Sequence, residues 1–172
     1  KCDPFSVTKR LHFSIDCDWV PGSQKGLETL LDCCDRYHMT ATVFFAGRFA
    51  QTYPDLVRAC HERGHQLGTH GWAHGGLERD EDFRTAGYEQ QREWIRRSTE
   101  AVERAAGVRP VIFRAPNLWI SETTLRVLEE EGHAVDLHLL GRVVHQVGGL
   151  EDRDRPRRDA PAEARVHVAP RR

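Results

Sequence analysis

The first regular element of the chain is visible in its alternation of apolar and polar residues. Leu11, Phe13 and Ile15 are apolar and the residues between them are polar, which is the period-2 pattern of a strand. Beyond Gly26 the apolar positions recur with a helical period, and these positions are Leu27, Leu30, Leu31, Cys34 and Tyr37. The uninterrupted apolar run 41–46 predicts a second strand that is covered on both faces.

Helices and strands continue to alternate further along the chain. The predicted elements are a helix from Pro54, a short strand at 66–70, a long polar helix at 80–106, a strand at 111–113 and a helix that is capped by Ser121 and buries Leu125 and Leu128. Strict alternation predicts an α/β fold in which parallel strands carry helices on the outside. Either an open doubly wound sheet or an incomplete barrel fits this order.

The C-terminal part has a different character. A fifth strand is predicted near Val135, whereas residues 151–172 contain almost no large apolar side chains. Such a segment buries too little surface to offset the entropy of ordering it, so a disordered tail is expected. We therefore divide the chain into a folded unit at residues 1–140 and a poorly structured tail, rich in Arg, Pro and Ala, at residues 141–172.

Composition narrows the functional classes. With 25 Lys and Arg against 26 Asp and Glu, the chain has no basic excess that would favour a nucleic-acid partner. No apolar run approaches the roughly 20 residues that cross a bilayer. No signal peptide is visible, which leaves the cytoplasm and the cell envelope open as locations. Five cysteines without CxxC spacing give no support for a zinc knuckle. Oligomeric state is not indicated.

Two aspartates mark the end of the first predicted strand. Side chains at positions i and i+2 leave the same face of a strand, so Asp16 and Asp18 lie about 7 Å apart along it. Parallel α/β folds build their sites at the C-terminal ends of strands, where two carboxylates can do different jobs. A solvated turn is the alternative interpretation, because Asp is common just past strand ends.

Two histidines at i and i+4 give the stronger signal for a metal. His70 and His74 follow the predicted strand at 66–70, and on one side of a helical turn their Cβ atoms would lie roughly 5–6 Å apart. The alternative is a pair of surface histidines in a chain that has ten. The paired aspartates at a nearby strand end favour the metal site.

The strand at 111–113 leads into a third polar group. Arg114 is placed to pair with Asp16 and keep it ionised and oriented, although a structural ion pair is the simpler interpretation. Pro116 would fix the backbone so that N–H groups near Asn117 face a developing oxyanion.

Two imidazoles and one carboxylate favour zinc, and cobalt, nickel, manganese and iron are also compatible. The same three ligands form the facial triad of non-haem iron oxygenases, a class for which a β-sandwich pattern would be expected.

Four blocks in order resemble the motifs of the polysaccharide deacetylases, the NodB-homology carbohydrate esterases. The blocks are Ser14-Ile-Asp-Cys-Asp18-Trp19, Ala41-Thr-Val-Phe-Phe-Ala-Gly47, the segment from Gly64 to His74, and Phe113-Arg-Ala-Pro-Asn117. The spelling of the first and last blocks is similar to the subgroup of exopolysaccharide and envelope deacetylases. The resemblance implies a distorted, incomplete (β/α) barrel and hydrolysis of an N-acetyl group on a glycan.

The resemblance also implies a role for each site residue. Asp16 corresponds to the catalytic base, and Arg114 corresponds to the arginine that pairs with it. Asp18, His70 and His74 correspond to the ligands of one divalent metal.

The chain departs from the family pattern in its last part. The family continues with a late Leu-X-His motif whose histidine is the general acid, and only His138 and His145 are loose equivalents here. We therefore expect metal binding with weak turnover. A metal-binding or sugar-binding remnant of the family is the alternative.

Overall fold

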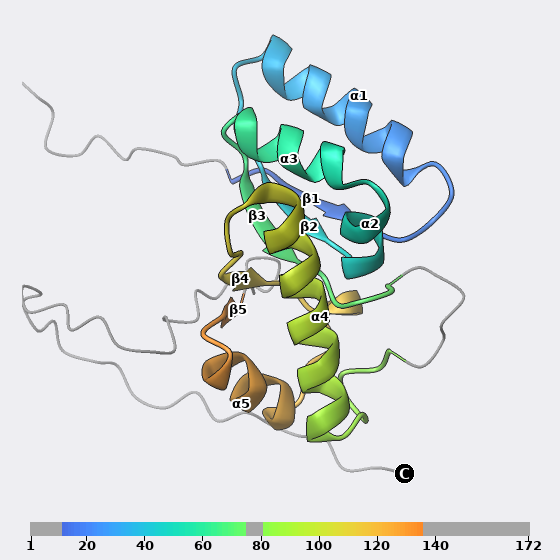
Figure 1. The fold of residues 1–172 in the computed structure, drawn as a ribbon, viewed down its shortest axis with the longest axis vertical. Helices are drawn as coiled ribbons and strands as arrows, with labels where there is room; N and C mark the ends of the chain where they lie inside the picture. The colour runs from blue at the N-terminus through green and yellow to red at the C-terminus, as the bar shows by residue number, and fades with distance from the viewer. Residues whose placement is uncertain (1–11, 75–80, 136–172) are drawn as a thin grey trace, which may run out of the picture.

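The computed structural model describes residues 12–74 and 81–135. A five-stranded parallel sheet forms its centre (Figure 1). Its strands are β1 (Ser14–Cys17), β2 (Thr42–Phe45), β3 (Gln66–Thr69), β4 (Ile112–Phe113) and β5 (Ala134–Val135). The helices are α1 (Ser23–Arg36), α2 (Gly47–Thr52), α3 (Pro54–Glu62), α4 (Tyr88–Ala106) and α5 (Glu122–Glu130), with a short 3₁₀ helix η1 (Pro116–Leu118) after β4.

The strand order decides between the two predicted architectures. The strands lie in the order β1-β2-β3-β4-β5, so every strand pairs with the next one along the chain. A doubly wound sheet reverses its order at a switch point, whereas a barrel wall does not. Right-handed crossovers in an unreversed order place all the helices on one face. The structure therefore confirms the incomplete (β/α) barrel, which stays open between β1 and β5 across the described residues.

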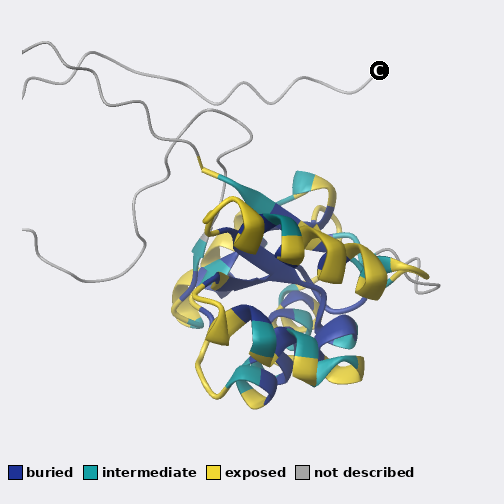
Figure 2. Ribbon diagram, turned by 90° about the horizontal axis from the view of Figure 1, so that it is seen from above, coloured by how far each residue is buried: buried dark blue, intermediate teal, exposed yellow. Residues whose placement is uncertain are grey.

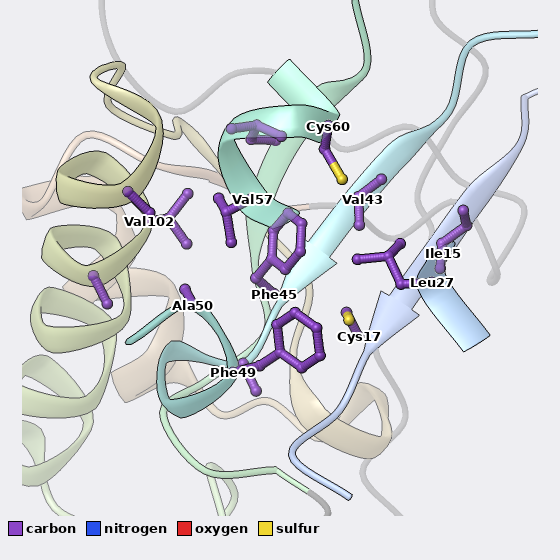
Figure 3. Close-up of a cluster of buried hydrophobic side chains, with 14 of the residues drawn as sticks. Ile15, Cys17, Leu27, Val43, Phe45, Phe49, Ala50, Val57, Cys60 and Val102 are labelled. Carbon is purple, nitrogen blue, oxygen red and sulfur yellow. The ribbon is translucent and has the colours of Figure 1, made fainter. Parts of the chain in front are cut away.

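The side chains of the strands show which face the helices cover. Ile15 of β1 is in register with Val43 of β2 and Leu67 of β3, and all three belong to one apolar cluster. Residues from α1, α2, α3 and α4 complete this cluster, and Figure 3 shows Leu27, Phe49, Ala50, Val57, Cys60 and Val102 around Phe45. Figure 2 shows the result, with buried strands at the centre and exposed outer faces on the helices. The opposite face of the sheet begins with Ser14 and Asp16.

A second, smaller cluster lies beneath α5. Phe113 of β4 packs against Phe83 with ring centroids 5.4 Å apart, and Ile95, Val127 and Leu128 are buried with them. Phe83 thereby holds the segment 81–87 against the sheet, ahead of α4.

The structure corrects three local predictions. The helix predicted over residues 80–106 begins at Tyr88, because Phe83 is buried in the core and Gly87 is extended. Helix α2 was not predicted, since its six residues are too few to show a helical period. In α5 the buried positions are Thr124, Val127 and Leu128, whereas Leu125 is exposed.

The predicted cap of α5 is confirmed, because Ser121 and Thr124 form a capping box. The parallel α/β sheet excludes the β-sandwich that an oxygenase of the facial-triad type would require. The boundary between the predicted folded unit at residues 1–140 and the tail at residues 141–172 lies outside the described residues, and the division stays a prediction. Across residues 12–74 and 81–135, no helix is long and apolar enough to cross a membrane.

Candidate metal centre

Three strand ends bring the predicted site residues to one edge of the sheet. Asp16 lies on β1 and Asp18 directly after it, His70 follows β3, and Arg114 follows β4. Because the strands are parallel and in sequential order, these C-terminal ends face the same side of the barrel. The His70–His74 segment completes the group.

Asp18, His70 and His74 form a compact set of metal-compatible donors. One ligand atom from each residue lies within 4.8 Å of the other two. The Nε2 atom of His70 is 3.6 Å from Oδ1 of Asp18, and the imidazole rings of His70 and His74 are perpendicular, with centroids 5.0 Å apart. The Asp18 Oδ1 atom is buried and has no hydrogen-bond partner within the described residues. A buried carboxylate oxygen of this kind requires a compensating charge or donor.

The tautomer of His70 is fixed by its second nitrogen. Its Nδ1 lies 2.8 Å from the main-chain carbonyl oxygen of Arg114, which can only accept a hydrogen bond. Neutral His70 therefore carries its proton on Nδ1 and directs the lone pair of Nε2 toward Asp18. Burial lowers the pKa of His70, which favours the neutral form that a metal ligand needs. The chemistry of the donor set thus fits one divalent cation.

Asp16 and Arg114 form the second half of the site. The Arg114 guanidinium donates to Asp16 Oδ1 through Nη1 and to Ser14 Oγ through Nη2, the latter at 2.9 Å. It also stacks over the ring of Phe44, 4.1 Å from the centroid. Only 4% of the Arg114 side chain is exposed, compared with 35% for Asp16. The arginine is therefore a fixed partner for a carboxylate that solvent can reach.

Ser14 and Phe44 were missed by the sequence reasoning. Ser14 could have been identified from the sequence, because it lies two residues before Asp16 and therefore on the same face of β1. Phe44 pairs with Asp16 in the sheet register. That pairing becomes known only once the strand order is known.

The segment from His70 to His74 is an irregular turn, which corrects the predicted helical turn. Gly71 has φ 71°, a left-handed conformation that ends any helical geometry at once. Main-chain bonds hold the turn to two neighbouring elements. The carbonyls of Gly71 and Trp72 accept from the first two N–H groups of α2, those of Gly47 (2.9 Å) and Arg48 (2.8 Å), and the N–H of Trp19 donates to the carbonyl of His74 (2.8 Å). The unpredicted helix α2 therefore supports residues 70–74, which we call the ligand turn.

Pro116 and Asn117 lie in η1, beside the ligand turn. Asn117 and Leu118 have positive φ angles of 54° and 58°. The N–H of Leu118 donates to the carbonyl of Ala115 and the N–H of Trp119 donates to that of Pro116, so both groups are used within the turn. The N–H groups of Leu118 and Trp119 are therefore not available for the predicted oxyanion contact, and Asn117 between Pro116 and Leu118 is an exposed residue.

Comparison with known proteins identifies the family of this chain. The family model for polysaccharide deacetylases matches residues 8–135. The chain belongs to the polysaccharide deacetylase family. A peptidoglycan deacetylase-like protein of Gibberella zeae is 30% identical over 118 residues, which cover 67% of this chain and 33% of that protein.

Solved structures of carbohydrate esterase family 4 share the fold. A family 4 carbohydrate esterase from Streptomyces lividans, solved with acetate, superposes with a TM-score of 0.60 at 25% identity and covers 72% of this chain and 60% of its own. A pseudoenzyme of carbohydrate esterase family 4 from Bacillus anthracis superposes with a TM-score of 0.63 at 14% identity, covering 72% of this chain and 41% of its own. The chain spans about a third of the length of the curated relatives it matches. The two loose equivalents of the late family histidine, His138 and His145, lie outside the described residues.

Proposed function

We propose that this chain hydrolyses the N-acetyl group of a sugar in a polysaccharide or glycoconjugate, with one divalent cation held by Asp18, His70 and His74. The observation that carries the proposal is the meeting of two groups at one edge of the sheet. One is the ligand set, and the other is the buried arginine paired with an accessible carboxylate. Family membership supports the same reaction class.

Asp16 is the base in this proposal. It accepts a proton from the water that attacks the acetyl carbonyl carbon, and general-base help of this kind contributes roughly 10²–10⁴ in rate. Arg114 holds the carboxylate in one orientation, and the stack on Phe44 holds the arginine. A cation bound by the three ligands would polarise the carbonyl and lower the pKa of water toward roughly 7. Asp16 then has only a modest proton transfer to perform.

Asn117 is the proposed oxyanion donor. Its main-chain N–H would stabilise the negative charge that develops on the carbonyl oxygen during attack. Pro116 supports this position because it fixes the backbone before Asn117 and packs closely against the ligand turn. A Cβ added to Gly71 would lie 2.8 Å from Pro116 Cγ.

Zinc is the proposed cation. Two neutral imidazoles and one carboxylate form a three-ligand set typical of catalytic zinc, with further positions for water and substrate. Cobalt, nickel, manganese and iron accept the same donors. The tautomer of His70 supports the assignment, since its Nδ1–H is engaged by a carbonyl as in many zinc sites.

The proposed substrate is an N-acetylated glycan of the peptidoglycan or exopolysaccharide type. The amine leaving group needs a proton when the C–N bond breaks, and His138 and His145 are the candidates for its donor. We expect turnover to be weak, as the sequence predicts, with cation binding less affected.

The test is acetate release from N-acetylated chito-oligomers and from peptidoglycan after zinc or cobalt is added. Wild type should release acetate and Asp16→Asn should not, while both bind zinc equally. Asp32→Asn is the matched control, because this aspartate of α1 has a side chain that is 75% exposed and pairs with Arg63, which is not a residue of the site.

Two results would contradict the proposal. Acetate release that is unchanged in Asp16→Asn would show that Asp16 is not the catalytic base. Zinc binding without acetate release from any substrate would favour a metal-binding or sugar-binding protein that has no turnover.

A further inference from the structure

A carboxylate that the proposed reaction does not use lies against the ligand turn. Glu81 precedes α4, and its Oε2 accepts a hydrogen bond from the N–H of Ala73 at 2.8 Å. Its other carboxylate oxygen, Oε1, accepts from the N–H of Trp72. Trp72 and Ala73 lie between the two histidine ligands, so Glu81 contacts the backbone that joins them.

The turn fits closely around this carboxylate. A Cβ added to Gly71 would lie 2.6 Å from Glu81 Oε1, which is closer than real atoms approach. The left-handed φ of Gly71, at 71°, turns the following N–H groups toward the carboxylate. The Glu81 carboxylate thus occupies space that any side chain at position 71 would need, and glycine leaves that space open.

The hydrogen bonds of the turn divide between two sides. On one side, α2 and Trp19 donate to the carbonyls of Gly71, Trp72 and His74. On the other side, Glu81 is the acceptor for the N–H groups of Trp72 and Ala73. Within residues 12–74 and 81–135, the Glu81 carboxylate is the side-chain group that accepts hydrogen bonds from the main-chain N–H groups of Trp72 and Ala73.

The charge of Glu81 is costly to bury and is compensated by these bonds. Burial raises the pKa of Glu81 to about 7, while the N–H groups of Trp72 and Ala73 act in the opposite direction. Two N–H donors require an acceptor on each oxygen, which an ionised carboxylate provides and an amide does not. A glutamine would turn its NH₂ group toward one of the donors and lose that bond.

We infer that Glu81 is a positioning residue of the metal centre, whose carboxylate holds the turn in the shape that brings His70 and His74 onto one cation with Asp18. This inference rests on the proposed metal site. The imidazole of His70 has an anchor of its own in the carbonyl of Arg114, so the main effect of losing Glu81 falls on the orientation of the His74 imidazole. Partners of this kind are typically worth roughly 10–100-fold in metal affinity.

The test compares Glu81→Gln and Glu81→Ala with wild type. The matched control is Glu89→Gln, an exposed glutamate in the first turn of α4. Zinc affinity is measured by competition with a chromophoric chelator, and we expect both Glu81 variants to lose about 10–100-fold while the control is unchanged. The ligand-field bands of the cobalt-loaded protein should shift in the Glu81 variants, because the positions of the ligands change. A purely structural role would lower the melting temperature of the metal-free protein and leave the bands in place.

Hydrogen exchange of the metal-free protein gives a readout that needs no cation. In Glu81→Gln the amides of Trp72 and Ala73 should exchange faster, and the amides of α1 should be unchanged. If wild type binds zinc and both variants bind it equally well, the inference is wrong. If wild type binds no zinc, the proposed function fails, and the exchange rates still decide whether Glu81 holds the turn. Because Glu81→Gln conserves shape, it keeps the test valid if Glu81→Ala does not fold.

Discussion

His133 is a buried base that should make the fold sensitive to acid. It is 1% exposed, and its Nε2 lies 3.0 Å from the hydroxyl oxygen of Thr99. This hydroxyl donates its own proton to the carbonyl of Ile95 at 2.8 Å, so it accepts from His133. The proton of the neutral imidazole is therefore on Nε2. The Nδ1 atom is buried without a hydrogen-bond partner in the part of the chain that the structure describes.

The magnitude of the effect follows from the pKa of this imidazole. Burial lowers the pKa of His133 from its ordinary value of 6.5 to about 4, and the charge of Arg109 acts in the same direction. The unfolded chain then binds a proton more readily than the folded chain. Stability that is fully present above pH 6.5 is lost as the pH falls toward 4, and it changes little below that. At about 1.4 kcal/mol per pH unit the loss is about 3 kcal/mol, a large part of the roughly 5–15 kcal/mol that stabilises a domain.

The assay is urea unfolding at a series of pH values from about 7 to about 4, a range that spans the ordinary and the lowered pKa of His133. Between these pH values the unfolding free energy of His133→Gln should fall less steeply than that of wild type. The difference in slope should correspond to about one proton, the one that His133 binds on unfolding. It should also be less stable at neutral pH, by about 1–3 kcal/mol, because packing and the bond to Thr99 are disturbed. His61→Gln, at an exposed position of α3, is the control and should follow wild type. Parallel pH curves for wild type and His133→Gln would refute the reasoning.

Three further predictions concern the metal centre directly. Elemental analysis should find about one equivalent of divalent metal per chain, and the double variant His70→Ala, His74→Ala should lose it; retention of the metal would contradict the ligand assignment. Calorimetric titration should show that Asp18→Asn weakens zinc binding whereas Asp16→Asn does not, and an equal loss in both would contradict the division of roles. Gly71→Ala should lower zinc affinity about 10-fold or more in chelator competition, because its Cβ would collide with a carboxylate oxygen at 2.6 Å; unchanged affinity would contradict the close fit.

Much of the fold could be predicted because the relevant signals are local. Helical periods, the capping residue Ser121 and the apolar run at 41–46 each depend on a few neighbouring positions. The choice between a barrel wall and a doubly wound sheet could not be made, because strand order depends on pairing between distant segments. Helix α2 was missed for another reason, since six residues give no measurable period.

The candidate site was predictable in its residue types and less so in its local geometry. The spacing of Asp16 and Asp18 and that of His70 and His74 are short-range patterns. The conformation of the turn depends on a left-handed glycine and on Glu81, whose bonds to main-chain N–H groups leave no side-chain pattern in the sequence. Arg114 was placed correctly beside Asp16 by its position after a strand, although 98 residues separate the two.

The sequential strand order has a consequence for how the centre is assembled during synthesis. Each strand pairs with the one made immediately before it, so the sheet can grow from its N-terminal edge as the chain leaves the ribosome. The three ligands are all encoded by residue 74, whereas Glu81 and Arg114 follow later. Synthesis therefore completes the candidate donor set before the two groups that contact or support it. If the chain binds a cation as proposed, its ligands are thus complete before Glu81 and Arg114 have been added.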